Sequence, residues 1–128
     1  MMTLGQVREI ADLGHEIGAH TVNHPKLSKV PVESARREML GSKDFLENLL
    51  GSAVTSFAYP KGDYNDTVKS LVTQIGFLRA VTVREGLVDS PDWIALPRIW
   101  ISNRLSDKGF EAKLSPALRW YTRLKGNY

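Results

Sequence analysis

The sequence contains no cysteine, which excludes disulfide bonds and every metal site that depends on thiolate ligands. Histidine is also scarce: the chain has three, and all of them lie between His15 and His24. Histidine chemistry is therefore confined to one short segment. Because no thiol is present, we expect any further metal ligand to be a carboxylate.

A long apolar run is missing as well. The longest runs are a few residues, whereas a membrane-spanning helix needs about 20. Residues 1–12 carry Arg8, Glu9 and Asp12 without an apolar core, so they do not resemble a signal peptide. We expect a soluble chain with no transmembrane segment and leave its compartment open.

The overall charge is small. Of 128 residues, 42% are hydrophobic and 24% are charged, which predicts one globular domain over residues 1–128. A net charge of +3 is too weak to indicate nucleic-acid binding, and no motif of that kind is present. A basic binding surface around Arg119, Arg123 and Lys125 is the least favoured alternative, so we predict no nucleic-acid partner.

Apolar spacing and turn residues predict alternating helices and strands, which is typical of an α/β fold with a parallel sheet. Thr3, Asn65 or Asp66, and Ser106 are suited to begin helices, and Gly14, Gly51 and Gly76 to end them. The expected helices cover residues 4–13, 32–50 and 66–75, with two more beginning at 107 and 116. Strands are expected at 15–20, 54–59, 80–83 and 98–101, with a turn at 89–92.

Two histidines lie four residues apart, His20 and His24, where the first strand ends. Two imidazoles at this spacing can direct ring nitrogens at one cation, and imidazole suits zinc, cobalt or nickel. The alternative is an ordinary pair of surface histidines beside a proline loop, which is commoner for an isolated pair. A place at the end of a strand favours binding, because α/β sheets hold ligands there.

Two other segments could carry chemistry. Pro60 and Gly62 follow a strand and impose an irregular backbone, which can bring an amide close to an oxyanion or form an ordinary turn. Arg98 lies among apolar residues and needs a partner or a path to solvent. Aromatic side chains could also stack on sugar rings, although most aromatics belong to cores. The candidates are Tyr59, Tyr64, Trp93, Trp100 and Trp120.

Together these segments resemble the polysaccharide deacetylases that share the NodB-homology domain. Residues 14–27 are similar to the second motif of that family, residues 57–62 to its third, and residues 95–99 to the end of the domain in one bacterial subgroup. The resemblance implies a distorted (β/α) barrel. It also implies metal-dependent removal of acetyl groups from N-acetylglucosamine-type carbohydrates by proteins that are often exported.

The resemblance assigns roles to particular residues. His20 and His24 would bind the divalent metal, with zinc expected and cobalt or nickel as alternatives. The backbone amide of Tyr59 would help to hold the oxyanion. Residues 57–62 lack the arginine that elsewhere in the family holds the catalytic aspartate, and we hypothesise that Arg98 takes that role. The substrate groove would be lined by Pro60, Lys61, Gly62 and Asp63.

The sequence departs from the family pattern in two motifs. No Asp-Asp pair occurs, although the family uses one as general base and metal ligand, and no histidine follows His24 to supply a general acid. We therefore expect a partial barrel lacking its first strands, weak metal binding and impaired activity. Asp63 or Asp66 could replace the missing ligand, but nothing in the sequence favours either.

Two further expectations follow from a partial barrel. An open sheet edge invites pairing with another chain, so we predict a homo-oligomer that covers it. The functional alternative to a deacetylase is an inactive remnant that binds carbohydrate or acts as a scaffold.

Overall fold

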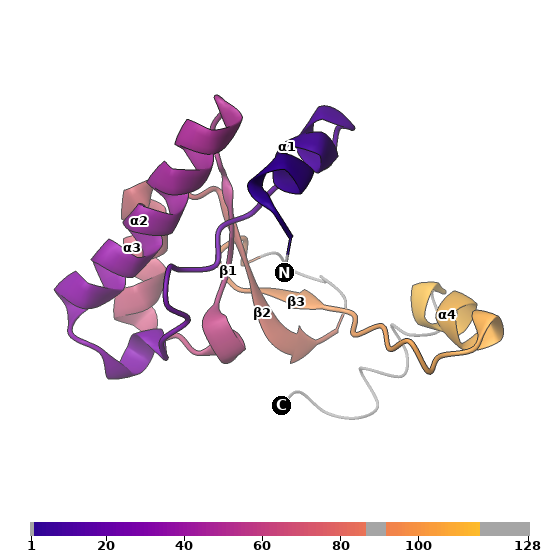
Figure 1. The fold of residues 1–128 in the computed structure, drawn as a ribbon. Coiled ribbons are helices and arrows are strands. Elements are labelled where there is room, and N and C mark those ends of the chain that lie inside the picture. Colours follow the sequence, from indigo (N-terminus) through magenta and orange to yellow (C-terminus); the bar gives the residue numbers. More distant parts are fainter. Residues whose placement is uncertain (1, 87–91, 116–128) are drawn as a thin grey trace.

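The computed structural model describes residues 2–86 and 92–115. A parallel sheet is packed against two helices, with a further helix at each end of the described chain (Figure 1). The helices are α1 (Leu4–Asp12), α2 (Val32–Leu50), α3 (Asp66–Ile75) and α4 (Asp107–Leu114). The strands are β1 (Ser56–Ala58), β2 (Arg79–Glu85) and β3 (Leu96–Arg98), and short 3₁₀ turns cover Leu27–Lys29 and Pro60–Gly62.

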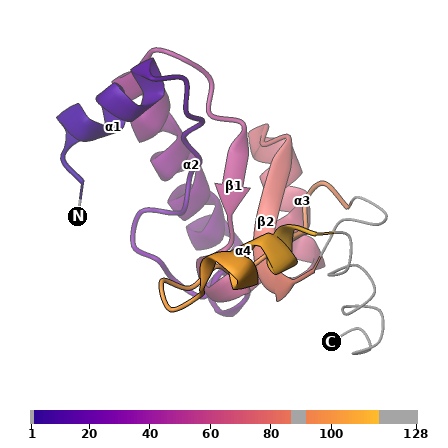
Figure 2. The same cartoon turned by 90° about the vertical axis from the view of Figure 1, so that its right-hand side faces the viewer.

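The sheet has the order β1-β2-β3, and both pairings are parallel. Ala19 joins the free side of β1 through a single parallel bridge to Phe57. Helices α2 and α3 lie together on one side of the strands (Figure 1). Helix α4 lies on the other side, near the carboxyl ends of the strands (Figures 1 and 2). The predicted α/β class and parallel sheet are confirmed.

The core lies between the sheet and the helices α2 and α3. Alternation along β1 and β2 turns Phe57 and Ala80 toward these helices, where both are almost fully buried. Helical spacing places apolar residues of α2 and α3 on the facing sides. The other core members include Leu27, Met39, Val68, Leu71, Val72 and Phe77.

The predicted helix ends are confirmed by their capping bonds. At α1, the Thr3 hydroxyl accepts from the Gln6 N–H at 3.3 Å, and the Gln6 side chain accepts from the Thr3 N–H at 2.8 Å. The side chain of Asn65 accepts from the Val68 N–H at 2.9 Å, which begins α3. Helix α2 ends at Gly51, whose φ of 68° is a left-handed conformation that suits glycine.

The strand boundaries differ from the predictions. A strand at 98–101 is wrong: β3 ends at Arg98, and the residues that follow are irregular. The pairing with β2 shifts register between Val81 and Glu85, which interrupts the ladder on the β3 side. The strand expected at 15–20 is reduced to the bridge at Ala19, held by bonds to Ser56 and Ala58 at 2.9 Å each.

Some predictions fall outside the described residues. These are the helix from residue 116, most of the turn at 89–92, and the basic residues Arg119, Arg123 and Lys125. None of the helices that the structure describes has the length and apolar character needed to cross a membrane.

Candidate metal and substrate site

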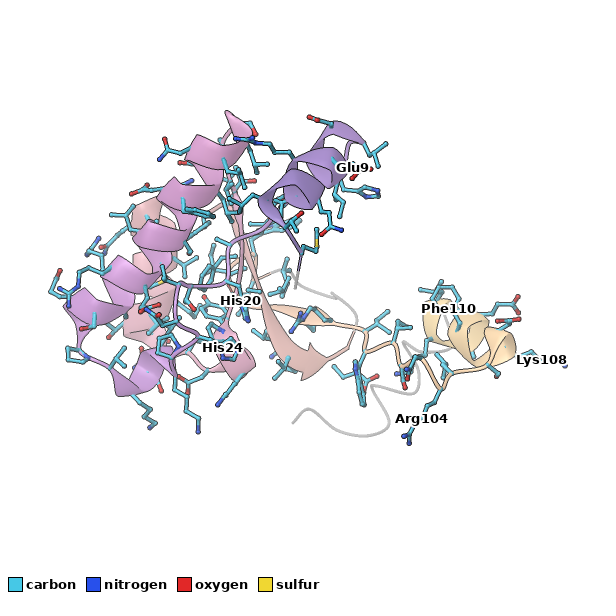
Figure 3. The ribbon with its side chains drawn as sticks, viewed as in Figure 1. Glu9, His20, His24, Arg104, Lys108 and Phe110 are labelled. Carbon is cyan, nitrogen blue, oxygen red and sulfur yellow. The ribbon has the colours of Figure 1, made fainter. Side chains whose placement is uncertain are left out.

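His20 and His24 lie side by side where the Ala19 segment leaves the sheet (Figure 3). Their ring centroids are 4.9 Å apart at an interplanar angle of 69°, and both residues are exposed. Nδ1–H of His20 donates to the carbonyl of Ala58 at 2.7 Å, because a carbonyl can only accept. This bond leaves the lone pair of His20 Nε2 available for a cation.

The backbone between the histidines is strained. Thr21 and His24 have φ angles of 63° and 56°, a left-handed conformation that costs a side-chain-bearing residue about 1–2 kcal/mol. The Thr21 hydroxyl donates to the His20 carbonyl at 2.5 Å and accepts from the His24 N–H at 3.1 Å. These bonds close the loop and bring the second imidazole back to the first.

Glu38, from helix α2, holds the same loop from outside. Its Oε2 accepts from the N–H groups of Val22 and Asn23 at 3.0 and 2.8 Å, and its Oε1 accepts from the Asn23 side chain at 2.7 Å. Partial burial raises the pKa of Glu38, but the bonds from Asn23 and Val22 outweigh it, so the net pKa lies below its usual range. The charged form of Glu38 therefore stabilises the loop.

A complete protein ligand set is not visible in residues 2–86 and 92–115, where no group of three His, Cys, Asp or Glu side chains could hold a metal. A catalytic zinc usually has three protein ligands. Both carboxylate oxygens of Asp63 accept from Ser28, at 2.7 and 2.9 Å, which ties the two loops together. Asp66 lies in the first turn of α3. Among the described residues, the His20–His24 pair is therefore not joined by a third His, Cys, Asp or Glu side chain.

The backbone N–H of Tyr59 is engaged elsewhere and does not match the oxyanion role that the resemblance implies. Its N–H donates to the Val81 carbonyl at 3.1 Å, continuing the sheet, so it is not free to hold an oxyanion in this conformation. Its hydroxyl donates to the Ile94 carbonyl at 2.8 Å. Burial, with lesser contributions from Tyr64 and Asp92, raises the pKa of Tyr59 well above its usual value, so the phenol stays neutral.

The Pro60–Gly62 turn follows directly and has an unusual backbone. Pro60 is buried and Lys61 is exposed, with φ angles of 57° at Lys61 and 67° at Gly62. A Cβ on Gly62 would lie 2.5 Å from Cγ2 of Val83, so only glycine fits against β2 here. The N–H of Lys61 has no acceptor among the described residues, which makes it the available amide of this turn.

Arg98 is not brought to the histidines. It ends β3, whereas the histidine loop adjoins β1, and β2 lies between them. Its Nε donates to the Thr82 carbonyl at 2.6 Å. No carboxylate in the described ranges pairs with its guanidinium, so the structure leaves its predicted partner open.

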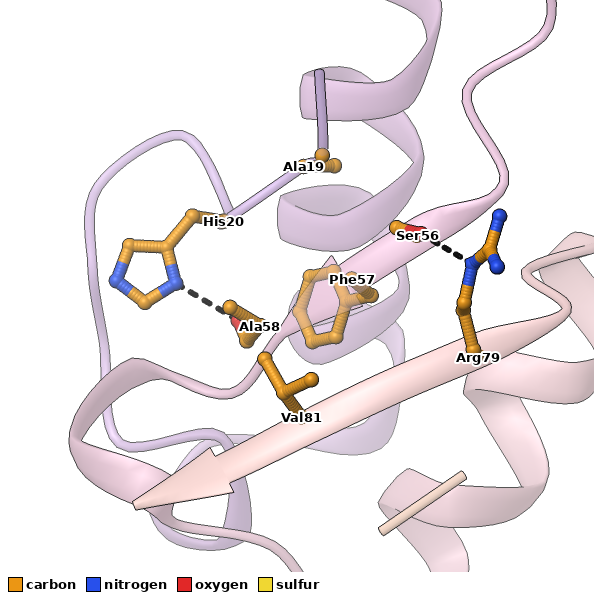
Figure 4. Close-up of a pocket in the computed structure, with 8 residues that line it drawn as sticks. Ala19, His20, Ser56, Phe57, Ala58, Arg79 and Val81 are labelled. Atoms are coloured by element: carbon orange, nitrogen blue, oxygen red, sulfur yellow. Dashed lines mark hydrogen bonds between the residues drawn. The ribbon is translucent and has the colours of Figure 1, made fainter. Parts of the chain in front are cut away.

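His20 also borders a pocket of about 170 Å³ on the sheet face opposite the core (Figure 4). At one end, Arg79 donates to Ser56 at 2.8 Å and pairs with Glu16 at 3.1 Å. Ser56 also donates to Glu16. The pocket is lined by Gly18, Ala19, His20, Ser56, Phe57, Ala58, Arg79 and Val81. This network was not predicted from the sequence, although Ser56 is a polar residue within a predicted strand, which is a usable signal.

Comparison with known proteins identifies the class. Residues 2–80 match the family model described as polysaccharide deacetylase, so the chain belongs to the polysaccharide deacetylase family. The solved deacetylase PplD of Streptococcus pyogenes, in complex with acetate, is 32% identical with a TM-score of 0.84. The likeness covers 90% of this chain and 51% of that one. The predicted partial barrel of the NodB deacetylase type is thereby confirmed.

Two curated relatives are similar in sequence. A peptidoglycan-N-acetylglucosamine deacetylase of Bacillus cereus is 29% identical over 81% of this chain and 36% of its own length. A chitooligosaccharide deacetylase of Azorhizobium caulinodans is 36% identical over 67% of this chain and 39% of its own length. The chain therefore spans well under half of these curated relatives.

Proposed function

We propose that these 128 residues carry part of the site of a carbohydrate N-deacetylase acting on N-acetylglucosamine-type substrates. The observation that carries the proposal is the His20–His24 pair at the end of a sheet segment, with Nε2 of His20 free to bind a cation. The curated relatives are named as deacetylases of peptidoglycan and of chitooligosaccharides, and these names support this substrate class.

His20 and His24 would hold a divalent metal, zinc first, with cobalt or nickel as alternatives. When bound, such a metal polarises the acetyl carbonyl and lowers the pKa of water. Glu38 and Thr21 fix the loop that brings the two imidazoles side by side. The N–H of Lys61, in place of that of Tyr59, is the amide we assign to the developing oxyanion.

The substrate groove in this proposal runs over the Pro60–Gly62 turn. Lys61 is exposed there and can donate to sugar hydroxyls, while buried Pro60 and half-buried Gly62 pack the turn closely against β2. Asp63 would support the groove indirectly, because its carboxylate accepts two hydrogen bonds from Ser28 and ties the two loops together. Arg98 would contribute to the site only indirectly, by positioning a carboxylate.

The isolated chain should be a poor catalyst. The sequence contains no Asp-Asp pair, and amide hydrolysis needs a base to take a proton from water. An inactive carbohydrate-binding remnant is the second candidate, favoured by the two-ligand set among the described residues. Carbohydrate binding by a folded chain that binds no metal through His20 would distinguish this candidate from an enzyme.

The test is acetate release from an acetylated chitooligosaccharide by the 128-residue chain with added zinc or cobalt, beside a His20→Ala variant. We expect release near background from a chain shown to be folded and to bind metal through His20. Release that needs metal and is lost in the variant would establish a deacetylase and contradict the proposed impairment. A chain that binds no metal through His20 would overturn the enzyme proposal.

We also propose that the chain self-associates through the free side of its sheet. Ala19 bridges β1 at one position only, and the sheet face that carries Gly18, Ser56 and Arg79 is open to solvent in the described structure. Unpaired backbone groups at a sheet edge favour pairing with another chain.

A further inference from the structure

A second hollow of the molecule lies at the carboxyl ends of β2 and β3. It has a volume of about 490 Å³ and is separate from the pocket beside His20. Its lining residues are Val83, Glu85, Arg98, Ile99 and Trp100. The indole of Trp100 is 72% exposed, although burying an aromatic of this size is normally favourable.

The segment that carries Trp100 is held in place and is not a loose end. Lys113, from α4, donates to the Trp100 carbonyl at 2.7 Å and to Oε1 of Glu85 at 2.6 Å. Arg98 is fixed by its bond to the Thr82 carbonyl. The indole is thus exposed on a positioned backbone, and holding it there without a ligand leaves apolar surface in contact with water.

The chemistry of the hollow combines an apolar platform with hydrogen-bonding groups at its rim. Trp100 and Ile99 supply the apolar surface, while Glu85 Oε2 has no partner among the described residues. The terminal nitrogens of Arg98 are likewise free of described carboxylates. A sugar ring matches this combination, because its C–H face is apolar and its hydroxyls both donate and accept.

The hollow also adjoins the Pro60–Gly62 turn of the candidate site. Val83 lines it, and Val83 is the residue against which Gly62 packs, so the Pro60–Gly62 turn adjoins its wall. The Ala19 segment and β3 are three strand spacings apart, about 14 Å at about 4.8 Å each. This separation exceeds the length of one sugar ring.

We propose that Trp100, with Glu85, forms a subsite that binds a sugar unit of the polymer beyond the unit that is deacetylated. This inference rests on the proposed function. Trp100 stacks on the ring, Glu85 binds hydroxyls, and Lys113 is the residue that positions Trp100 and Glu85. The subsite selects chains of several units over a single sugar.

The test is binding of N-acetylchitotetraose to the 128-residue chain without metal, followed by calorimetry and by the indole N–H signals of the tryptophans in NMR spectra. We expect the Trp100 signal to shift and Trp100→Ala to weaken binding about tenfold, with Trp100→Phe retaining most of the affinity. Trp93→Ala is the matched control, because Trp93 is 58% exposed and lies near the other end of the sheet, where its carbonyl accepts from Ala80.

Three results would overturn the subsite: unchanged affinity in Trp100→Ala, an equal loss in Trp93→Ala, or no tetraose binding by the folded chain. A Trp100 signal that shifts with protein concentration, without sugar, would assign the hollow to a second copy and also overturn it. Failure of the proposed function gives a different pattern, in which tetraose binding depends on Trp100 while no metal binds through His20.

Discussion

Single residues hold the candidate site through hydrogen bonds to the backbone around the proposed metal ligands. Glu38 accepts three hydrogen bonds from the loop between His20 and His24, and Thr21 accepts one from within it. These bonds offset a left-handed backbone at two residues with side chains. The geometry of the histidine pair therefore depends on a carboxylate that is not one of the proposed metal ligands.

Glu38→Gln should destabilise the loop in a pH-dependent way. A glutamine amide cannot accept from both backbone N–H groups and Asn23 as a carboxylate does, so we expect a loss of about 1 kcal/mol at neutral pH. The folded-state pKa of Glu38 is lowered, so its stabilisation is present above the unfolded value of 4.5 and is lost as pH falls through the folded-state pKa.

Urea denaturation of wild type and Glu38→Gln between pH 3 and 7 checks this, and the difference should shrink below about pH 4.5. Asp44→Asn, an exposed position on the same helix, is the control and should change little. A difference that is constant over the whole range would show that the charge of Glu38 does not stabilise the loop.

Gly62 and Gly76 offer a matched pair of substitutions to alanine. Both have positive φ, 67° and 95°, so each should lose about 1 kcal/mol from backbone strain. A Cβ at Gly62 would also meet Val83 at 2.5 Å, whereas nothing lies within 4 Å at Gly76. We expect Gly62→Ala to cost about 2 kcal/mol more in urea denaturation, and equal losses would disprove the close contact.

At the scale of elements, the helices differ in how many side chains they bury in the core. Helix α3 places Val68, Leu71 and Val72 in the core, while α1 has no buried residue. Stability is unevenly distributed when elements differ in this way, and a helix without buried residues can open alone. A lost cap should therefore have different consequences in the two helices.

Asn65→Ala removes the cap of α3 and should lower the free energy of global unfolding by about 1 kcal/mol. Thr3→Ala removes the capping box of α1 and should fray that helix without moving the main transition. Hydrogen exchange of α1 amides, beside urea denaturation, measures both effects. A shift of the main transition in Thr3→Ala as large as that in Asn65→Ala would show that α1 is part of the cooperative core.

Sequence reasoning predicted helices better than strand boundaries. Thr3, Asn65 and Gly51 mark helix ends through bonds to neighbouring residues, so local sequence contains the signal. The end of β3 depends on a register shift against β2, and the role of the Tyr59 amide depends on Val81. Pairings between distant residues cannot be read from a local pattern.

The same distinction applies to the candidate site. The spacing of His20 and His24 identified a pair that the fold does bring together. Glu38, the Arg79–Glu16 pair and the Trp100 hollow join segments that are far apart in the sequence. Only the arrangement of the elements reveals them, and Arg98 remains a predicted positioning residue without its partner.

At the scale of the whole molecule, the open side of the sheet should govern association. Sedimentation velocity over a range of concentrations should show a dimer or larger species, because the Ala19 edge can pair with a second copy. Replacing Gly18 with proline should reduce association, since proline removes an N–H from that edge. A chain that stays monomeric at high concentration would contradict the proposal.

The central claim is that His20 and His24 form a metal-binding pair. The most direct measurement is a zinc titration of the 128-residue chain by calorimetry, with His20→Ala, His24→Ala and His15→Ala. His15 is the matched control, because it is exposed, close in sequence and outside the pair. We predict one weak site in wild type and His15→Ala that is lost in both other variants. Zinc binding that survives in His20→Ala, or that is lost in His15→Ala, would contradict the account.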